Sequence, residues 1–208
     1  MLDKAVAVLA AVDAQPRSLI ELQAATGLPR ATAHRLATAL EGHGLLRRNG
    51  DGRFTLGLRL IGLGRAAGDA FPLRDAARPV LEQLAADTGE SVQLFVRQGD
   101  VRVCVDALES SHGLRWIVPV GAVLPLGRGS AGRLLDGGTT AEPWVASVEE
   151  REAGVCSVSA PVVAANGRIV AAVSVSGPVE RLTRQPGERY GNAVEAAARA
   201  IESAARIR

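Results

Sequence analysis

Cysteine, histidine and aromatic residues are scarce in this chain of 208 residues. The two cysteines, Cys104 and Cys156, lie far apart and form no CxxC pair, which argues against a disulfide framework or a zinc site. We expect two buried thiols, and neither a metal ion nor a cofactor. Aromatic residues make up only 3% of a chain that is 47% hydrophobic, so its cores must consist mostly of alanine, valine and leucine.

Long uncharged hydrophobic runs are also missing. The apolar N-terminal segment carries Asp3, Lys4 and Asp13 in helical phase, which is unlike a signal peptide or a membrane-spanning helix. No later window of membrane length is free of charged residues. The sequence therefore predicts a soluble cytoplasmic protein that has no membrane partner.

Groups suited to catalysis are few. Only three histidines are present, and His34 and His43 lie in the basic N-terminal segment. A Ser-His-acid arrangement would have to depend on His112 in a polar loop. The acidic run at residues 149–152 is typical of a solvated loop, so we do not expect an enzyme.

A glycine-rich segment at residues 127–132, GRGSAG, matches the GxGxxG pattern of dinucleotide-binding loops. Its context argues against that function, because the surrounding strands are predicted to be antiparallel and no repeated βαβ pattern is present. We interpret the segment as the entry to a short helix over residues 130–135. Free N–H groups at such an entry can contact an anion, which makes the segment one wall of a candidate pocket.

The first third of the chain has the apolar spacing of short helices, predicted over residues 2–14, 18–25 and 29–42. Ser18 and Glu21 form the S-x-x-E pattern of a capping box. Gly27 bends the chain before the third helix, and Pro29 suits the first turn of that helix. Two helices joined in this way are typical of a helix-turn-helix.

A hairpin follows the three helices. Residues 45–48 and 53–56 read as short strands, and the sequence Asn-Gly-Asp-Gly at residues 49–52 between them is rich in turn residues. This hairpin is the candidate wing. Residues 1–57 are thus predicted to form a winged helix-turn-helix domain, and double-stranded DNA is the first partner to consider.

Charge is unevenly distributed along the chain. Residues 1–65 carry nine basic and five acidic residues, a net charge of +4, whereas the remaining fifteen basic and seventeen acidic residues give −2. Such asymmetry fits an N-terminal segment that faces phosphate.

We place the third helix in the major groove, where Arg30 or Arg35 could form a bidentate contact with guanine. The wing arginines would lie near phosphate or the minor groove. For each arginine the alternative is a solvated surface charge. The predicted DNA-contacting residues are Arg30, Thr32, Ala33, His34, Arg35, Arg47, Arg48 and Arg53.

Residues 58–70 predict a linker helix that Gly62, Gly64 and Gly68 weaken. Such a helix needs a neighbour, either a second subunit or its own domain. Residues 71–208 are predicted to form an α+β domain with an antiparallel sheet. Its elements are a long helix after Pro72, strands over residues 91–96, 101–105, 114–120, 157–163 and 169–176, and a final helix over residues 191–207.

Serines alternate with apolar residues in two of these strands. Alternation places Ser174 and Ser176 on one face of their strand, and Ser157 belongs to the same pattern in the partner strand. Asn166-Gly167 is a strong hairpin signal that makes the two strands neighbours. A patch of small hydroxyls suits a small ligand that carries a carboxylate or a keto group. The alternative is a solvent-exposed face, although such faces usually carry larger polar residues.

Several segments together resemble the IclR (isocitrate lyase regulator) family of bacterial transcription factors over nearly the whole chain. The segments are LDKA at residues 2–5, GLPRATAHRL at 27–36, RFTLG at 53–57, GES at 89–91 and VSVSGP at 173–178. Two others, EREAGV at 150–155 and SVSAPV at 157–162, are similar to an actinobacterial subgroup that controls amino-acid biosynthesis, leucine biosynthesis included.

This resemblance implies a GAF-like effector-binding domain, palindromic operators, and homodimers or dimers of dimers. It also implies a small carboxylate metabolite, an amino acid or a keto acid, as the effector. Residues 136–143 are shorter here than the helical segment that usually lies over the family's pocket. A rival interpretation is a metabolite-binding dimerisation module that does not bind DNA. The pocket positions that the family implies are Trp116, Leu124, Ser130, Ala131, Val155, Ser157, Ser174 and Ser176.

Overall fold

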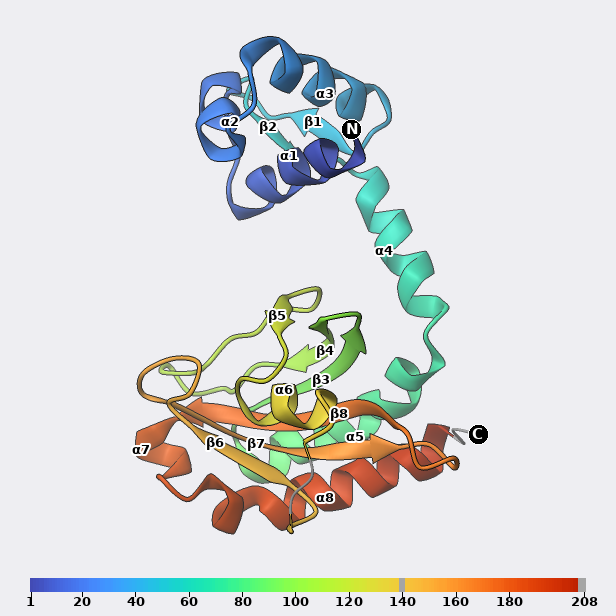
Figure 1. The fold of residues 1–208 in the computed structure, drawn as a ribbon, viewed down its shortest axis with the longest axis vertical. Helices are drawn as coiled ribbons and strands as arrows, with labels where there is room; N and C mark the ends of the chain where they lie inside the picture. The colour runs from blue at the N-terminus through green and yellow to red at the C-terminus, as the bar shows by residue number, and fades with distance from the viewer. Residues whose placement is uncertain (139–140, 206–208) are drawn as a thin grey trace. The chain divides into compact units, whose positions relative to one another are not determined.

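The structure, a computed structural model, describes residues 1–138 and 141–205. The chain divides into two compact units, Met1–Ala70 and the part from Phe71 onward, and each is described by itself (Figure 1). The architecture is α+β, as predicted, with a helical N-terminal unit and a larger unit that contains an antiparallel sheet. Within the described ranges, no helix has both the length and the apolar composition that crossing a bilayer requires.

Three helices and a short hairpin form the N-terminal unit. They are α1 (Leu2–Ala14), α2 (Leu19–Thr26), α3 (Arg30–Gly42), β1 (Leu46–Arg48) and β2 (Phe54–Leu56). The capping box is present, because Glu21 N–H donates to Ser18 Oγ and Ser18 N–H donates to the Glu21 carboxylate. Gly27 ends α2 in the left-handed conformation with φ +65°. Pro29 is the N-cap residue of α3 and does not occupy its first turn.

The core of the N-terminal unit joins the helices to the hairpin. Its most deeply buried residues include Val8, Leu22, Ala37, Leu46 and Phe54. Two backbone hydrogen bonds of 2.9 and 2.7 Å link Arg17 to Phe54. Gly57 has to be small, because a Cβ there would lie 2.0 Å from the carbonyl oxygen of Gly44. The hairpin is therefore fixed to the helices by close backbone contacts.

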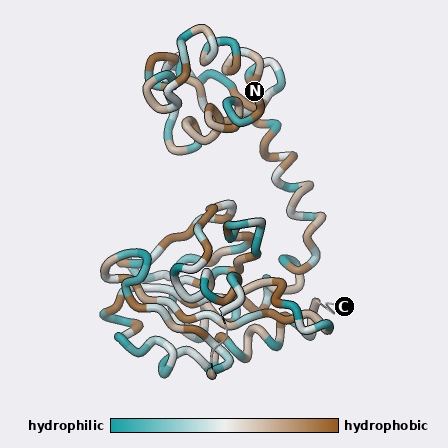
Figure 2. The backbone as a smooth tube through the Cα atoms, in the orientation of Figure 1, coloured by the Kyte–Doolittle hydropathy of each residue, from teal (hydrophilic) through white to brown (hydrophobic). Residues whose placement is uncertain are grey.

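The predicted linker helix is α4 (Arg59–Asp69), and none of its residues is buried. Hydrophobic and hydrophilic residues alternate along it (Figure 2). The apolar side chains at its start remain open to solvent, with exposed fractions of 69% for Leu58, 70% for Ile61 and 50% for Leu63.

Six antiparallel strands form the sheet of the second unit in the order β5-β4-β3-β8-β7-β6. They are β3 (Ser91–Gln98), β4 (Val101–Leu108), β5 (Val123–Pro125), β6 (Val145–Val148), β7 (Val155–Val163) and β8 (Ile169–Pro178). The predicted turn at Asn166 and Gly167 joins β7 to β8, and Gly167 has φ +81°. The serine-bearing strands β7 and β8 are therefore neighbours inside the sheet, and neither is an edge strand.

Helices cover both faces of this sheet. α5 (Pro72–Thr88) and α8 (Pro186–Ala205) pack together on one face, α6 (Ser130–Leu135) lies on the other, and α7 (Val179–Leu182) follows β8 (Figure 1). Val92 and Val175 belong to the core under α5 and α8, whereas Phe95 and Ala172 belong to the core under α6. Because strand residues alternate between the two faces, polar residues on the α6 face can line a cavity.

Two local predictions of secondary structure are wrong. Residues 114–120 form no strand: Trp116 and Val118 pack inward while Leu114 and Val120 are exposed, so the alternation is present without a pairing strand. The last helix begins at Pro186 and not at residue 191, because proline suits the first helical position. This helix is described as far as Ala205, so its predicted end at residue 207 lies outside the described residues.

Candidate functional site

The helix α3 has one buried and one exposed face. Ala37 and Leu40 pack into the core, while Arg30, His34 and Arg35 are exposed. Neither arginine makes a hydrogen bond or an ion pair with the part of the chain that the structure describes. Both guanidinium groups are thus free to contact another molecule, and their donor geometry matches guanine edges and phosphates.

The prediction that Ala33 contacts DNA is wrong. Ala33 is fully buried, because it lies on the same helical stripe as Ala37 four residues later. A buried methyl group cannot reach a base edge. Thr32 is half-buried at the border of the exposed face.

The three wing arginines differ in their intramolecular contacts. Arg48 lies 4.1 Å from the centroid of the Phe54 ring, and its Nε is 3.5 Å from a carboxylate oxygen of Glu41. Arg53 forms an ion pair with Glu21. Arg47 is exposed and has no partner among the described residues. Two of the three wing charges are therefore partly neutralised by acids of the same unit.

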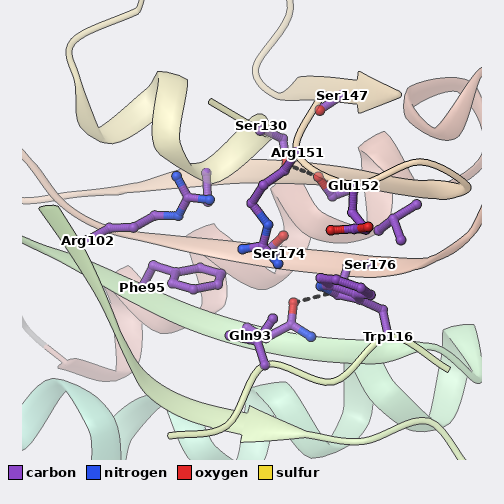
Figure 3. A pocket seen from close by; sticks show the side chains of 15 residues that line it. Gln93, Phe95, Arg102, Trp116, Ser130, Ser147, Arg151, Glu152, Ser174 and Ser176 are labelled. Atoms are coloured by element: carbon purple, nitrogen blue, oxygen red, sulfur yellow. Dashed lines mark hydrogen bonds between the residues drawn. The ribbon is translucent and has the colours of Figure 1, made fainter. Parts of the chain in front are cut away.

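A cavity of about 40 Å³ lies on the α6 face of the sheet in the second unit (Figure 3). Strands β3, β4, β6, β7 and β8, the start of α6 and three connecting segments contribute to its wall. Its lining residues are Gln93, Phe95, Arg102, Trp116, Val118, Gly129, Ser130, Ala131, Ser147, Arg151, Glu152, Val155, Ser157, Ser174 and Ser176.

Serine hydroxyls from α6, β7 and β8 form a hydrogen-bonded network at this cavity. The strand register pairs Ser157 with Ser176 and Ser159 with Ser174. Ser130 Oγ lies 2.7 Å from the hydroxyls of both Ser157 and Ser159. Ser159 then donates a hydrogen bond of 2.9 Å to Ser174. Since a hydroxyl both donates and accepts, this network offers groups of either kind to a small polar ligand.

The structure brings seven of the eight predicted pocket residues to this cavity: Trp116, Ser130, Ala131, Val155, Ser157, Ser174 and Ser176. Leu124 does not line it. This residue lies on β5 opposite Arg102 and packs against the core under α6.

Five polar residues of the wall were not assigned to the pocket from the sequence: Gln93, Arg102, Ser147, Arg151 and Glu152. Ser159, behind the wall, shares a face with Ser157 and continues the serine alternation that predicted the hydroxyl patch. Gln93 accepts a hydrogen bond of 2.9 Å from Ser176, and its place inside an apolar strand was an available signal. Arg102 interrupts an apolar strand in the same way. Arg151 lies in the turn before β7, where no sequence pattern pointed to it.

The two arginines of the cavity have no ion-pair partner in the described chain. Arg102 is only 3% exposed, and its Nη1 donates to the carbonyl oxygens of Pro125 and Arg128 over 2.6 and 2.7 Å. Burial, and then the positive charge of Arg151, lowers the pKa of Arg102 to about 10. Burial also lowers the pKa of Arg151, whose guanidinium lies 5.1 Å from the centroid of the Trp116 ring. The cavity wall is therefore positively charged.

The glycine-rich segment at residues 127–132 contributes to the cavity without the features of a dinucleotide site. Gly127 and Gly129 have φ values of +75° and +72°. The Gly129 N–H donates to a carboxylate oxygen of Glu150 over 3.0 Å, so this amide already has an anionic partner. A Cβ at Gly132 would lie 1.9 Å from Nη1 of Arg102. The glycines thus give the loop its conformation and leave room for a buried guanidinium.

Comparison with known protein families covers both units. The IclR helix-turn-helix domain matches residues 1–50, and the bacterial transcriptional regulator IclR C-terminal domain matches residues 66–136 and 138–203. The chain belongs to the IclR family. IclR relatives are transcriptional regulators and not enzymes, which agrees with the sequence prediction.

Individual relatives resemble the chain to different extents. The transcriptional regulator KipR of Bacillus subtilis is 34% identical over 116 residues, which are 56% of this chain and about half, 46%, of KipR. The glycerol operon regulatory protein of Streptomyces coelicolor is 27% identical over 201 residues, covering 80% of this chain and 79% of that protein.

Solved structures of IclR proteins share the fold. A putative regulator of the family from Rhodococcus sp. has 31% identity and a TM-score of 0.58, and the match covers 97% of this chain and 92% of that one. An IclR homologue from Microbacterium hydrocarbonoxydans, crystallised with 4-hydroxybenzoate, has 23% identity and a TM-score of 0.82, with 99% and 98% covered.

Proposed function

We propose that this IclR protein binds operator DNA sequence-specifically and that a small carboxylate metabolite, an amino acid or a keto acid, modulates that binding. The observation that carries the proposal is the pair Arg30 and Arg35, exposed and unpartnered in the described chain on the face of α3 opposite its buried stripe. In this proposal residues 1–57 bind DNA and residues 71–208 bind the effector. Residues 58–70 form the linker helix that connects these two domains.

DNA binding follows from placing α3 in the major groove. Arg30 and Arg35, in the N-terminal half of the helix, then reach base edges, and His34 lies between them on the exposed face. Thr32, half-buried at the edge of that face, is also proposed to reach a base edge. The wing arginines Arg47, Arg48 and Arg53 contribute phosphate contacts.

Mobility-shift titration on a fragment identified by genomic footprinting tests this placement. Arg30→Ala and Arg35→Ala should each weaken binding by about 1 to 3 kcal/mol and relax sequence preference. Arg199→Ala, which removes an exposed arginine of α8 that pairs with Glu195, is the matched control and should keep wild-type affinity. Wild-type affinity in both α3 variants would contradict the proposal and favour a dimerisation module that does not bind DNA.

Effector binding is supported by the chemistry of the cavity. Its serine hydroxyls, its positive wall and the Trp116 ring suit a compact acid. The Microbacterium relative was crystallised with a small carboxylic acid, which agrees with this assignment. Isothermal titration with branched-chain amino acids and 2-keto acids tests it. Absence of heat with every acid, together with intact operator binding, would contradict the sensing function.

We assign the uncovered apolar residues of α4 to contact with a second subunit, in a homodimer or a dimer of dimers. Leu58 and Ile61 are each more than two-thirds exposed, and a twofold assembly would match a palindromic operator. Light scattering of wild type and Ile61→Asp tests this contact. A smaller assembly is expected for the variant, and an unchanged mass would contradict the assignment.

The regulated genes are proposed to be those of amino-acid biosynthesis, leucine biosynthesis among them. Support comes from residues 150–155 and 157–162, which are similar to the actinobacterial subgroup with that role. Genomic footprinting tests it directly. Bound sites confined to promoters of unrelated pathways would contradict it.

A further inference from the structure

Two positive charges meet in the cavity of the second unit. Arg102 enters it from β4, and Arg151 extends inward from the turn between β6 and β7 (Figure 3). Nε of Arg102 is buried and has no hydrogen-bond acceptor in the described chain. Arg151 is half-buried, and its guanidinium lies over the face of the Trp116 ring. It makes no hydrogen bond and no ion pair among the described residues.

An unpaired guanidinium in such a place costs free energy. Removing a charge from water is unfavourable unless an opposite charge compensates, and two like charges in one cavity also repel. Other charges buried in this unit are compensated: Glu90 pairs with Arg181, and Asp106 pairs with Arg78. Burial lowers the pKa of Arg151 and the charge of Glu152 raises it, so Glu152 compensates that guanidinium in part, whereas no acid compensates Arg102 in the described chain. The excess positive charge of the cavity therefore points to an anion from outside the chain.

Acidic groups at the cavity are too few to accept a cation. Glu152 is the one acid among the described lining residues, and it is exposed, where solvent screens its charge. The other polar lining groups are neutral, such as the hydroxyl of Ser174 and the amide of Gln93. An ammonium group that entered would meet two guanidinium groups and no buried carboxylate.

We propose that Arg102 and Arg151 form an anion-binding subsite that selects small acids of net negative charge over zwitterionic amino acids. The carboxylate of the ligand is bound by the two guanidinium groups. Its keto or hydroxyl oxygen accepts hydrogen bonds from serines of β7 and β8. This inference rests on the proposed effector function and chooses between the two ligand classes that the function leaves open.

The test uses pairs of ligands that differ mainly in the group on C2: pyruvate and alanine, 2-oxobutyrate and 2-aminobutyrate, and 2-oxoisovalerate and valine. Isothermal titration of the full chain should show that the oxo acid of the best-fitting pair binds at least about tenfold tighter than its amino acid. Arg151→Gln should weaken binding of that oxo acid by a similar factor. Arg199→Gln, which removes an exposed arginine of α8 that pairs with Glu195, should change nothing.

Arg151 is the residue to replace, because its side chain can be changed without removing a contact that holds the fold. Arg102 also holds the backbone at Pro125 and Arg128, so replacing it would disturb the fold as well as the subsite. Arg151 makes no hydrogen bond in the described chain, so Arg151→Gln should fold normally. Equal thermal unfolding temperatures of Arg151→Gln and wild type, measured without ligand, would show that the variant folds normally.

Operator affinity measured in parallel separates this inference from the proposed function. An amino acid that binds as tightly as its oxo acid and alters operator affinity would overturn the subsite and support effector sensing. Arg151→Gln binding the oxo acid with wild-type affinity would also overturn the subsite. If none of the six compounds produces heat, the subsite is overturned, while DNA binding still depends on the Arg35→Ala result.

Discussion

The carboxylate of Glu21 on α2 forms an ion pair with the guanidinium of Arg53, which precedes β2 in the wing. The same carboxylate accepts a hydrogen bond of 2.7 Å from the backbone N–H of Ser18 and so completes the capping box of α2. One ionised group thus stabilises a helix end and anchors the wing. Its protonation should weaken both contacts together.

The first prediction concerns pH. The hydrogen bonds from Ser18, and to a smaller extent the charge of Arg53, lower the pKa of Glu21 below its ordinary value of 4.5. A carboxyl group with a lowered pKa in the folded state adds stability above its unfolded pKa and loses it as pH falls through the folded pKa. The stability difference between wild type and Glu21→Gln should therefore be largest near neutral pH and shrink in acid.

Urea unfolding between about pH 3 and pH 7 measures this difference. Asp100→Asn, at an exposed aspartate in the turn between β3 and β4 with no ion pair in the described chain, is the control and should show no pH-dependent difference. A constant difference for Glu21→Gln over the whole range would contradict the assigned role of its ionised form.

The second prediction separates the wing arginines by their salt dependence on DNA. Arg47 has no intramolecular partner in the described chain, so Arg47→Ala should reduce the slope of log affinity against log salt by about one phosphate contact. Arg53→Ala should change the slope less, because Glu21 already neutralises part of that charge. DNA titrations at several salt concentrations measure both slopes. A larger change of slope for Arg53→Ala than for Arg47→Ala would contradict this prediction.

The third prediction tests the close approach of α6 to β4. Gly132→Ala places a methyl group on the guanidinium of Arg102, which is held in place by two backbone carbonyls. We expect a loss of about 1 to 3 kcal/mol in the free energy of unfolding, together with weaker ligand binding. Gly113→Ala meets nothing within 4 Å and should change stability little. Equal unfolding curves for the two variants would show that Arg102 moves aside freely.

The fourth prediction concerns the ion pair that joins Arg181 on α7 to Glu90, the residue before β3. Glu90 is 2% exposed, and its oxygens accept hydrogen bonds of 2.6 and 2.8 Å from Arg181. Arg181→Ala would leave a buried carboxylate without compensation and should cost about 3 kcal/mol. Adding Glu90→Gln to this variant should recover part of the loss in denaturant unfolding. A double variant less stable than Arg181→Ala would contradict this explanation.

Local patterns in the sequence determined the elements of the N-terminal unit and the serine-bearing hairpin. Helical spacing, the Ser18–Glu21 capping box and the turn residues act over a few neighbouring positions, so they can be interpreted without knowing the fold. The same holds for Ser174 and Ser176, whose shared face follows from the alternation of a strand. The glycine-rich entry to α6 indicated a pocket wall from its own sequence, and resemblance to a family supplied the individual positions Trp116, Ser130, Ala131 and Val155.

Tertiary structure decided what depends on pairing and packing between distant segments. Residues 114–120 alternate like a strand but have no strand beside them, and Ala33 is fully buried in a unit where α1, α2 and β1 all pack against α3. Arg102 and Arg151 come from separate segments, and only the folded sheet brings their charges to one cavity. Long-range contacts set burial and electrostatics, so the charge of this cavity could not be known from the order of residues alone.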